Sequence, residues 1–423
     1  MLGLRQPRMM RNISALRWLA THSRTGPSGR RVLMPAYRQM SSAAPEGSSA
    51  KIRVERVTDF EHILDKSDSY SQIPSRAIIE VSGKDASEFL QGLQCNHMPL
   101  IDQGGAGMLT GFLAPQGRVI ADGFVYPRNA GVNFPHPVFL VEVDARMKER
   151  LLKIMRFYKL RARISLRDAS EEYAVWGVWG PGSGALGEST AAADVWLADG
   201  RAPGMGLRLI LPRDAKPALP HKFEQKPSEI YALRRILKGV PEGPEDFAPD
   251  ASVPLECNLD YMGGVHFSKG CYVGQELTIR THHRGVVRKR VVPVLLSSAE
   301  SNPTGANPLC IDLGFAQQQL AGLKPQPQAD VTRVEMGGSE QHAEAEESHQ
   351  QSAKPARSRR LPPGKLGGSM FNAGLALMRL EHVEAYMAQE AAGVSDARRL
   401  AFETTAANGG RLFVSPWSPS WWP

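Results

Sequence analysis

The chain has few cysteines and no long apolar run, and each shortage argues against a class of protein. Its 423 residues contain four cysteines in no C-x-x-C arrangement: Cys95, Cys257, Cys271 and Cys310. A disulfide-rich secreted module is therefore disfavoured, and this cysteine usage suits a reducing compartment. The apolar stretches are short and broken by charges, far from the roughly 18 uninterrupted residues that a membrane helix needs. We therefore expect a soluble protein with no membrane span.

Acidic residues and lysine are absent from residues 1–45, which contain eight arginines and several serines. Mitochondrial transit peptides have this composition, and apolar residues such as Leu16 and Leu19 would give the segment an amphipathic helix. We predict that residues 1–45 are a mitochondrial transit peptide, with a plausible processing site before Ser41, and that the mature protein lies in the mitochondrial matrix. The alternative is a basic arm that contacts nucleic acid or a membrane.

Residues 1–45, called the leader below, also account for the basic character of the chain. The formal net charge is +8, and the eight arginines of the leader supply all of this excess, so residues 46–423 are formally neutral. A strongly basic mature domain would indicate a nucleic-acid partner. Because that excess is missing, we expect no nucleic acid among the partners of the mature chain.

Apolar periodicity predicts an α+β fold in which short strands alternate with single helices. Strands are predicted near 77–81, 107–113, 118–126, 138–143, 163–167, 173–179 and 207–211, with amphipathic helices near 145–160 and 227–238. Another helix is predicted after Ser82–Gly83–Lys84–Asp85, because Phe89, Leu90 and Leu93 follow at helical spacing. We assign these elements to residues 46–285 and a β domain to residues 286–423.

Residues 322–366 differ in composition from the rest of the predicted β domain. They are rich in Gln, Glu, Ser, Pro, Gly and Ala and contain almost no aromatic residue. Such a segment cannot bury enough apolar surface to offset the conformational entropy that ordering removes. We therefore predict a disordered insertion at about 322–366, with a partner-binding segment as the alternative.

One stretch, Lys269–Gly270–Cys271–Tyr272–Val273–Gly274–Gln275–Glu276, concentrates reactive groups. It holds an ammonium, a thiol, a phenol, an amide and a carboxylate, together with glycines that permit sharp bends or close approach. In an extended segment Lys269 and Cys271 would leave the same face, and a neighbouring cation favours the thiolate. The pair predicts a reactive Cys271 that Lys269 activates. A small buried cysteine in a glycine turn is the plain alternative.

Basic and imidazole side chains are dense after this motif: Arg280, His282, His283, Arg284, Arg288, Lys289 and Arg290. A positive field beside one thiol favours an anionic partner, and arginine favours bidentate contacts with carboxylates. A structural zinc site needs four ligands, and a resident iron–sulfur cluster normally uses four cysteines. The scattered cysteines meet neither pattern. A cluster bound transiently between Cys271 and the thiolates of a partner is chemically reasonable.

The octapeptide and its flanks resemble the signature of the folate-binding YgfZ/GcvT-like family, written K-G-C-[FY]-x-G-Q-E. The matching flanks are Pro254, Glu256, Asn258, Leu259, Asp260, Gly264–Val265, Phe267 and Thr281–His282–His283. The segment from Phe89 to Asn96 also resembles the first-domain signature, but His97 stands where an acid usually follows. The resemblance covers about residues 70–297 and resumes near 362–423. It implies a GcvT/YgfZ-like multi-domain α+β fold with antiparallel sheets and a C-terminal β-barrel-like domain.

The mitochondrial branch of this family, which the chain resembles, consists of iron–sulfur cluster assembly factors. The resemblance implies support for inserting four-iron four-sulfur clusters into aconitase-like and radical-SAM enzymes. It implies A-type scaffold proteins and recipient apoproteins as partners, and a non-catalytic assembly role. It also implies a tetrahydrofolate-binding pocket, with Asp122 and Arg280 as folate contacts, although Asp122 could equally be a solvated strand residue.

The alternative function is a folate-dependent aminomethyl or one-carbon transferase related to the glycine-cleavage T protein. That relative does not need the K-G-C-Y-x-G-Q-E motif, and its folate positions need no thiol. The motif around Cys271 therefore favours the assembly factor over the transferase.

Overall fold

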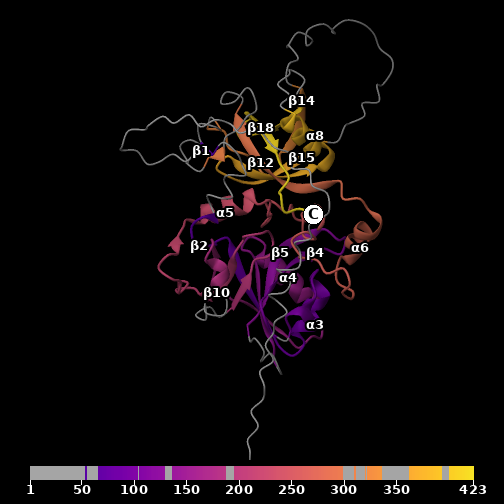
Figure 1. Cartoon of the computed structure of the whole chain (residues 1–423). Helices are drawn as coiled ribbons and strands as arrows, with labels where there is room; N and C mark the ends of the chain where they lie inside the picture. The colour runs from indigo at the N-terminus through magenta and orange to yellow at the C-terminus, as the bar shows by residue number, and fades with distance from the viewer. Residues whose placement is uncertain are drawn as a thin grey trace, which may run out of the picture. The chain divides into compact units, whose positions relative to one another are not determined.

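The computed structural model describes residues 53–54, 65–102, 104–128, 136–186, 195–298, 309–310, 320, 322–335, 362–392 and 400–423 (Figure 1). The predicted transit peptide at 1–45 lies outside these residues. None of the helices in the described residues is both long enough and apolar enough to cross a bilayer.

The first sheet has five strands, all joined to their neighbours in antiparallel fashion. Its order is β4 (Met108–Leu113), β5 (Val119–Pro127), β6 (Val138–Asp144), β3 (Arg76–Ser82) and β7 (Ser165–Asp168). The helices α3 (Ala86–Leu93) and α4 (Lys148–Tyr158) bury their apolar residues in one cluster with strand residues such as Val81 and Val141. These strands and helices confirm the periodicities read from the sequence.

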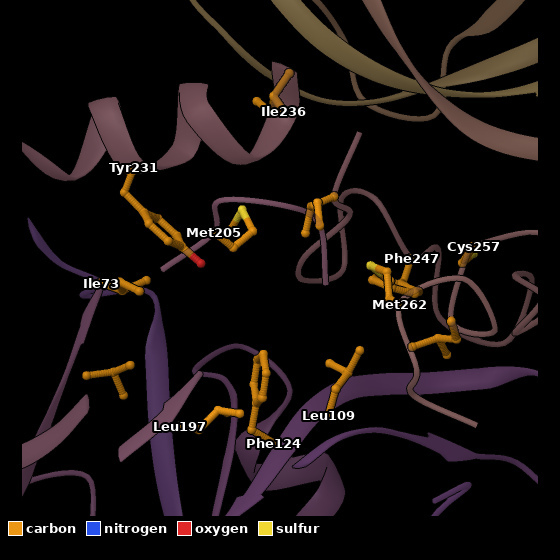
Figure 2. Packing of buried hydrophobic residues seen from close by; sticks show 14 of the residues in the cluster. Ile73, Leu109, Phe124, Leu197, Met205, Tyr231, Ile236, Phe247, Cys257 and Met262 are labelled. Carbon is orange, nitrogen blue, oxygen red and sulfur yellow. The ribbon is translucent and has the colours of Figure 1, made fainter. Parts of the chain in front are cut away.

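A second five-stranded sheet lies in the same half of the chain. Its order is β11 (Glu224–Gln225), β2 (Ser69–Gln72), β8 (Tyr173–Trp179), β10 (Leu207–Pro212) and β9 (Val195–Ala198). Only the short β11–β2 pair is parallel. Helix α5 (Ser228–Leu237) sends Tyr231 and Ile236 into the large core that includes Phe124 of β5 and Met205 (Figure 2).

A buried network of charges crosses this core. Glu142 is fully buried and accepts hydrogen bonds from Arg76 at 2.6 Å and from Arg208 at 2.8 Å. The hydroxyl of Tyr126 donates to the same carboxylate at 2.8 Å. Burial tends to raise the pKa of Glu142, but Arg208 and Arg76 outweigh that effect and hold the pKa below its usual range. Because buried charges need partners, the network joins strands of both sheets in one arrangement.

The C-terminal part is a closed six-stranded barrel, which confirms the predicted barrel-like domain. Its order is β12 (Lys289–Ser298), β16 (Ala373–Arg379), β15 (Gly364–Met370), β14 (Asp330–Glu335), β17 (Leu400–Thr405) and β18 (Arg411–Pro416). Helix α8 (Leu380–Ala391) adds Val383 and Tyr386 to the barrel core. A short pair, β1 (Arg53–Val54) with β13 (Leu309–Cys310), completes the described strands.

The predicted disordered insertion at about 322–366 was wrong at its N-terminal end, where the chain forms β14. Strand β14 pairs with β17 along five register positions, and β15 begins at Gly364. Val331 of β14 is fully buried in the barrel core. One inward-facing valine and a continuous ladder are enough to order this polar strand, which composition alone does not reveal. Residues 336–361 of the predicted insertion lie outside the described residues.

The second half of the K-G-C-Y-V-G-Q-E motif opens a helix, α6 (Gln275–Arg284), which begins against the β4–β5 turn. Gly274 has a left-handed φ of 79°, and a Cβ there would collide with the carbonyl oxygen of Ala114 and lie 2.8 Å from Cβ of Leu113. At Gly117 in the turn, a Cβ would lie 2.5 Å from Cβ of Leu277. The two glycines therefore let the helix and the hairpin touch backbone to backbone.

Replacing Gly274 with alanine is expected to lower the free energy of unfolding by roughly 2 kcal/mol or more, since the left-handed conformation and the collision both penalise a Cβ. Gly270→Ala is the matched control, because no atom lies within 4 Å of a Cβ at that position. It should change stability little, or raise it by up to about 1 kcal/mol. Urea denaturation of both variants measures the difference. Equal stability of the two variants would contradict this packing.

Replacing Glu142 with alanine leaves Arg76 and Arg208 buried without their shared carboxylate. We expect a loss of about 3–5 kcal/mol in the free energy of unfolding. Glu171→Ala is the control, because that side chain is 90% exposed and lies 4.0 Å from Arg213; it should cost no more than about 0.5 kcal/mol. Denaturant titration measures the free energy of unfolding of each variant. A loss below about 1 kcal/mol for Glu142→Ala would show that the network is dispensable.

Candidate functional site

The ammonium of Lys269 is bound to the C-terminal end of helix α3. It donates hydrogen bonds to the backbone oxygens of Gln91, Gln94 and Asn96 at 2.7, 2.6 and 2.7 Å. Carbonyl groups at the end of a helix lack intrahelical partners and carry the negative end of its dipole. An ammonium has three N–H donors, so these bonds use all of them. Lys269 thereby fastens the motif to α3.

The electrostatic surroundings of Lys269 differ from those expected. Burial lowers the pKa of Lys269 to about 8, so the group is still mainly protonated at neutral pH. The thiol whose charge affects the pKa of Lys269 is that of Cys95. Cys95 is fully buried, and this burial raises its own pKa to about 12. The ammonium also lies 4.7 Å from the centre of the Tyr272 ring. Lys269 therefore attaches the motif to α3 in the structure, and the activation of Cys271 by Lys269 stays a prediction.

Cys271 is exposed, whereas Cys95 and Cys257 are buried. It lies at an open depression of about 730 Å³ whose other lining residues are Lys269, Gly270, Gln275, Glu276, Ile279, Arg280, His283 and Arg284. Among the cysteines whose side chains the structure describes, it is the one that a partner can reach. The plain alternative of a buried core cysteine is therefore wrong for Cys271.

Helix α6 forms one wall of this depression and supplies its positive charge. Arg280, His283 and Arg284 come from its second half, and Glu276 comes from its first turn. Such a wall attracts anionic groups to the thiol. The sequence analysis missed this helix, although an acid in its first turn and basic residues in its last are known start and stop signals.

Stacked rings and backbone bonds fix the segment that leads into the motif. The ring centres of Phe267 and His282 lie 3.6 Å apart, which joins the loop to α6. The rings of His97 and His266 stack at 4.8 Å, and burial, followed by the charges of His266 and Lys269, lowers the pKa of His97. An imidazole thus packs against the loop where the family signature usually has an acid.

The remaining motif residues complete the attachment to the first sheet and to α3. Tyr272 is buried, and its N–H donates to the side-chain oxygen of Gln275 at 3.3 Å. The N–H of Val273 donates to the carbonyl oxygen of Gly92 at 3.0 Å. Asn96 is a supporting residue that sequence reasoning did not single out, because its amide bridges the carbonyl oxygens of Leu109 and Gly263. Its partners are distant in sequence, so only the fold reveals this role.

The two predicted folate contacts lie in different surroundings. Asp122 is only 2% exposed, so it is not the solvated strand residue of the alternative reading. Its carboxylate oxygens are engaged by Arg76 at 3.0 Å and by the N–H of Gly243 at 2.9 Å. Arg280 is exposed on the depression at Cys271. Their role as folate contacts stays a prediction. Near Asp122, one buried N–H-bearing atom of Arg76, Nη2, lacks a hydrogen-bond partner among the described residues.

The described residues contain no group of three or more His, Cys, Asp or Glu side chains placed to hold a metal ion. Within this part of the chain, Cys271 could therefore supply one thiolate to a metal centre whose other ligands come from elsewhere. The described site is therefore an exposed thiol in a depression that Arg280 and Arg284 also line.

Two family models match this chain and together span most of the described fold. Residues 73–201 match the GCVT N-terminal domain, and residues 288–423 match the CAF17 C-terminal beta-barrel domain. The crystal structure of glycine cleavage system aminomethyltransferase T from Bartonella henselae has a similar fold, with a TM-score of 0.55 over 86% of this chain and 88% of that chain. The identity is 11%, so this likeness concerns the fold alone.

Curated relatives are similar over nearly the same length. The iron-sulfur cluster assembly factor IBA57 homolog, mitochondrial, of Mycosarcoma maydis is 35% identical over 364 residues, covering 84% of each chain. The homolog of Neurospora crassa is 37% identical over 321 residues, covering 74% of this chain and 70% of its own. Because these relatives are named mitochondrial, the predicted localisation is confirmed at the level of the family. The chain belongs to the family of mitochondrial iron–sulfur cluster assembly factors represented by the IBA57 homologues.

Proposed function

We propose that this protein acts in the mitochondrial matrix by lending the thiolate of Cys271 to an iron–sulfur cluster as the cluster passes from a scaffold protein to a recipient enzyme. The observation that carries the proposal is the exposure of Cys271 in a depression with a cationic wall. The names of the IBA57 relatives supply the cluster as the cargo. The recipients would be aconitase-like and radical-SAM enzymes that need four-iron four-sulfur clusters.

The proposed step is a ligand exchange at iron. The thiol of Cys271 loses its proton to solvent, and its sulfur forms a bond to an iron of the cluster. A thiolate of the scaffold leaves that iron and takes up a proton. The number of thiolate ligands and the oxidation state of the cluster are unchanged. The family resemblance implies an A-type scaffold protein as the partner. A second chain would supply the other ligands, because Cys271 is the one exposed thiol among the cysteines whose side chains are described.

Residues of the depression and of the motif have different parts in this step. A cluster held by thiolates is anionic, so Arg280 and Arg284 lower the electrostatic cost of bringing it to Cys271. Lys269 holds the motif on α3, and Gly274 allows α6 to start where its wall faces the thiol.

A tetrahydrofolate-binding pocket and one-carbon transfer form the alternative proposal. Its support is the GCVT N-terminal domain match and the unpartnered Nη2 atom of Arg76 beside Asp122. That atom could donate to an oxygen or nitrogen of a bound pterin or carboxylate. This alternative makes no use of the exposed thiol, so the two functions respond differently to loss of Cys271.

Cys271→Ala and Cys271→Ser are expected to abolish aconitase activity in a strain that lacks the protein, because no other described thiol reaches the surface. Protein level and circular dichroism should stay as in the wild type, since Cys271 is exposed. Cys257→Ala is the matched control, which removes a buried thiol and should keep aconitase active.

Methylene transfer from tetrahydrofolate, assayed on the same purified variants, separates the alternative. Full aconitase activity with Cys271→Ala would refute the assembly proposal. Methylene transfer that is robust in wild type and Cys271→Ala alike would favour the transferase.

A further inference from the structure

A groove of about 400 Å³ lies between the end of α3, the segment after α4, and the motif. Its apolar lining includes Phe89, Leu93, Tyr158, Leu160 and Val273. Val273 belongs to the K-G-C-Y-V-G-Q-E motif, and its N–H is bonded to Gly92, another lining residue. Cys271 is only two residues before Val273, so the groove and the depression at the thiol border the same short segment of the motif.

Two large apolar side chains stand exposed next to this groove. Phe157 is 73% exposed and packs edge-on against Tyr158, with 5.1 Å between the ring centres. Leu160 is 86% exposed and has a φ of +44°. The left-handed region costs a residue with a Cβ roughly 1–2 kcal/mol, and glycine is the usual choice where a helix ends in it. Within the described fold, no burial of the Leu160 side chain offsets the strain of its backbone. Its presence therefore points to a state in which a partner covers this side chain.

The surroundings of these apolar side chains are positively charged. Lys153 and Arg156 come from the exposed side of α4, and Lys159 and Arg161 line the groove. None of the four forms an ion pair with a carboxylate of the described residues, whereas nearby Lys148, Arg150 and Arg163 are paired with Asp168, Asp250 and Asp85. Glu88 is the exposed acid of the groove. The excess of unpaired cations complements an acidic partner.

We propose that this groove, with Phe157 and Leu160, is the docking site for an acidic segment of the scaffold protein that carries an apolar anchor side chain. The inference rests on the proposed function for the identity of the partner. A concave groove receives an inserted side chain, whereas a membrane surface is flat and would leave it empty, so a protein segment is the occupant that fits. Docking here would hold the scaffold's cluster beside Cys271.

The test uses the purified chain with a purified A-type scaffold protein and measures the dissociation constant at 50 and 300 mM salt. Leu160→Asp should weaken binding at least tenfold, because it removes the anchor contact and adds a repelling charge. Aspartate tolerates a left-handed φ better than leucine does, so a loss of fold is not the expected cause. Leu100→Asp is the matched control, because Leu100 is 60% exposed and does not line the groove; it should bind as the wild type does.

The double variant Arg156→Glu/Arg161→Glu should also weaken binding at least tenfold and flatten its salt dependence. Unchanged binding by Leu160→Asp, or a wild-type protein that binds vesicles with anionic lipid but not the scaffold, would overturn the docking site. If Cys271→Ala keeps aconitase fully active in cells while Leu160→Asp binds poorly, the cluster role fails and the docking site stands.

Discussion

The three hydrogen bonds from Lys269 to the end of α3 set the position of everything around the thiol. They neutralise carbonyl groups that the helix leaves without partners, and they fix the chain two residues before Cys271 and four before Val273. Gly274 then turns the backbone into α6 against the β4–β5 turn. The exposed thiol, its cationic wall and the apolar groove are therefore arranged by one lysine, one glycine and the ends of two helices.

The cysteines differ in how deeply their thiols are buried. Cys95 lies in the core under the motif, where desolvation keeps its thiol protonated and therefore poor as a metal ligand. Cys257 is equally buried, and burial raises its pKa to about 12. Cys271 lies on the outside, where a partner can reach it. Among the cysteines whose side chains are described, the fold thus exposes one thiol and buries two.

The sequence predicted the parts of this fold that depend on local patterns. Short apolar runs revealed β5 and β8, which are buried along their whole length, and helical spacing revealed α4, which buries one face. It failed where long-range contacts decide. Strand β14 is polar and is ordered by its barrel neighbours, and α6 has one buried residue, Thr278, so it shows little apolar periodicity.

The same division applies to the candidate site. The motif located the thiol and its basic surroundings, because family resemblance preserves residue types at fixed spacing. It could not reveal that the ammonium of Lys269 points to α3, since Gln91, Gln94 and Asn96 are more than 170 positions away. Nor could it reveal that the carboxylate of Asp122 accepts hydrogen bonds from Arg76 and from the N–H of Gly243 in the core.

The most direct test of the account is the rate at which iodoacetamide alkylates Cys271, followed by mass spectrometry of its peptide. The rate should be high in the free protein. With a cluster-loaded A-type scaffold protein it should fall at least tenfold, because the sulfur is then bound to iron. The same scaffold without its cluster should slow the reaction far less. Equal alkylation rates with the loaded and the empty scaffold would contradict the claim that Cys271 binds the cluster.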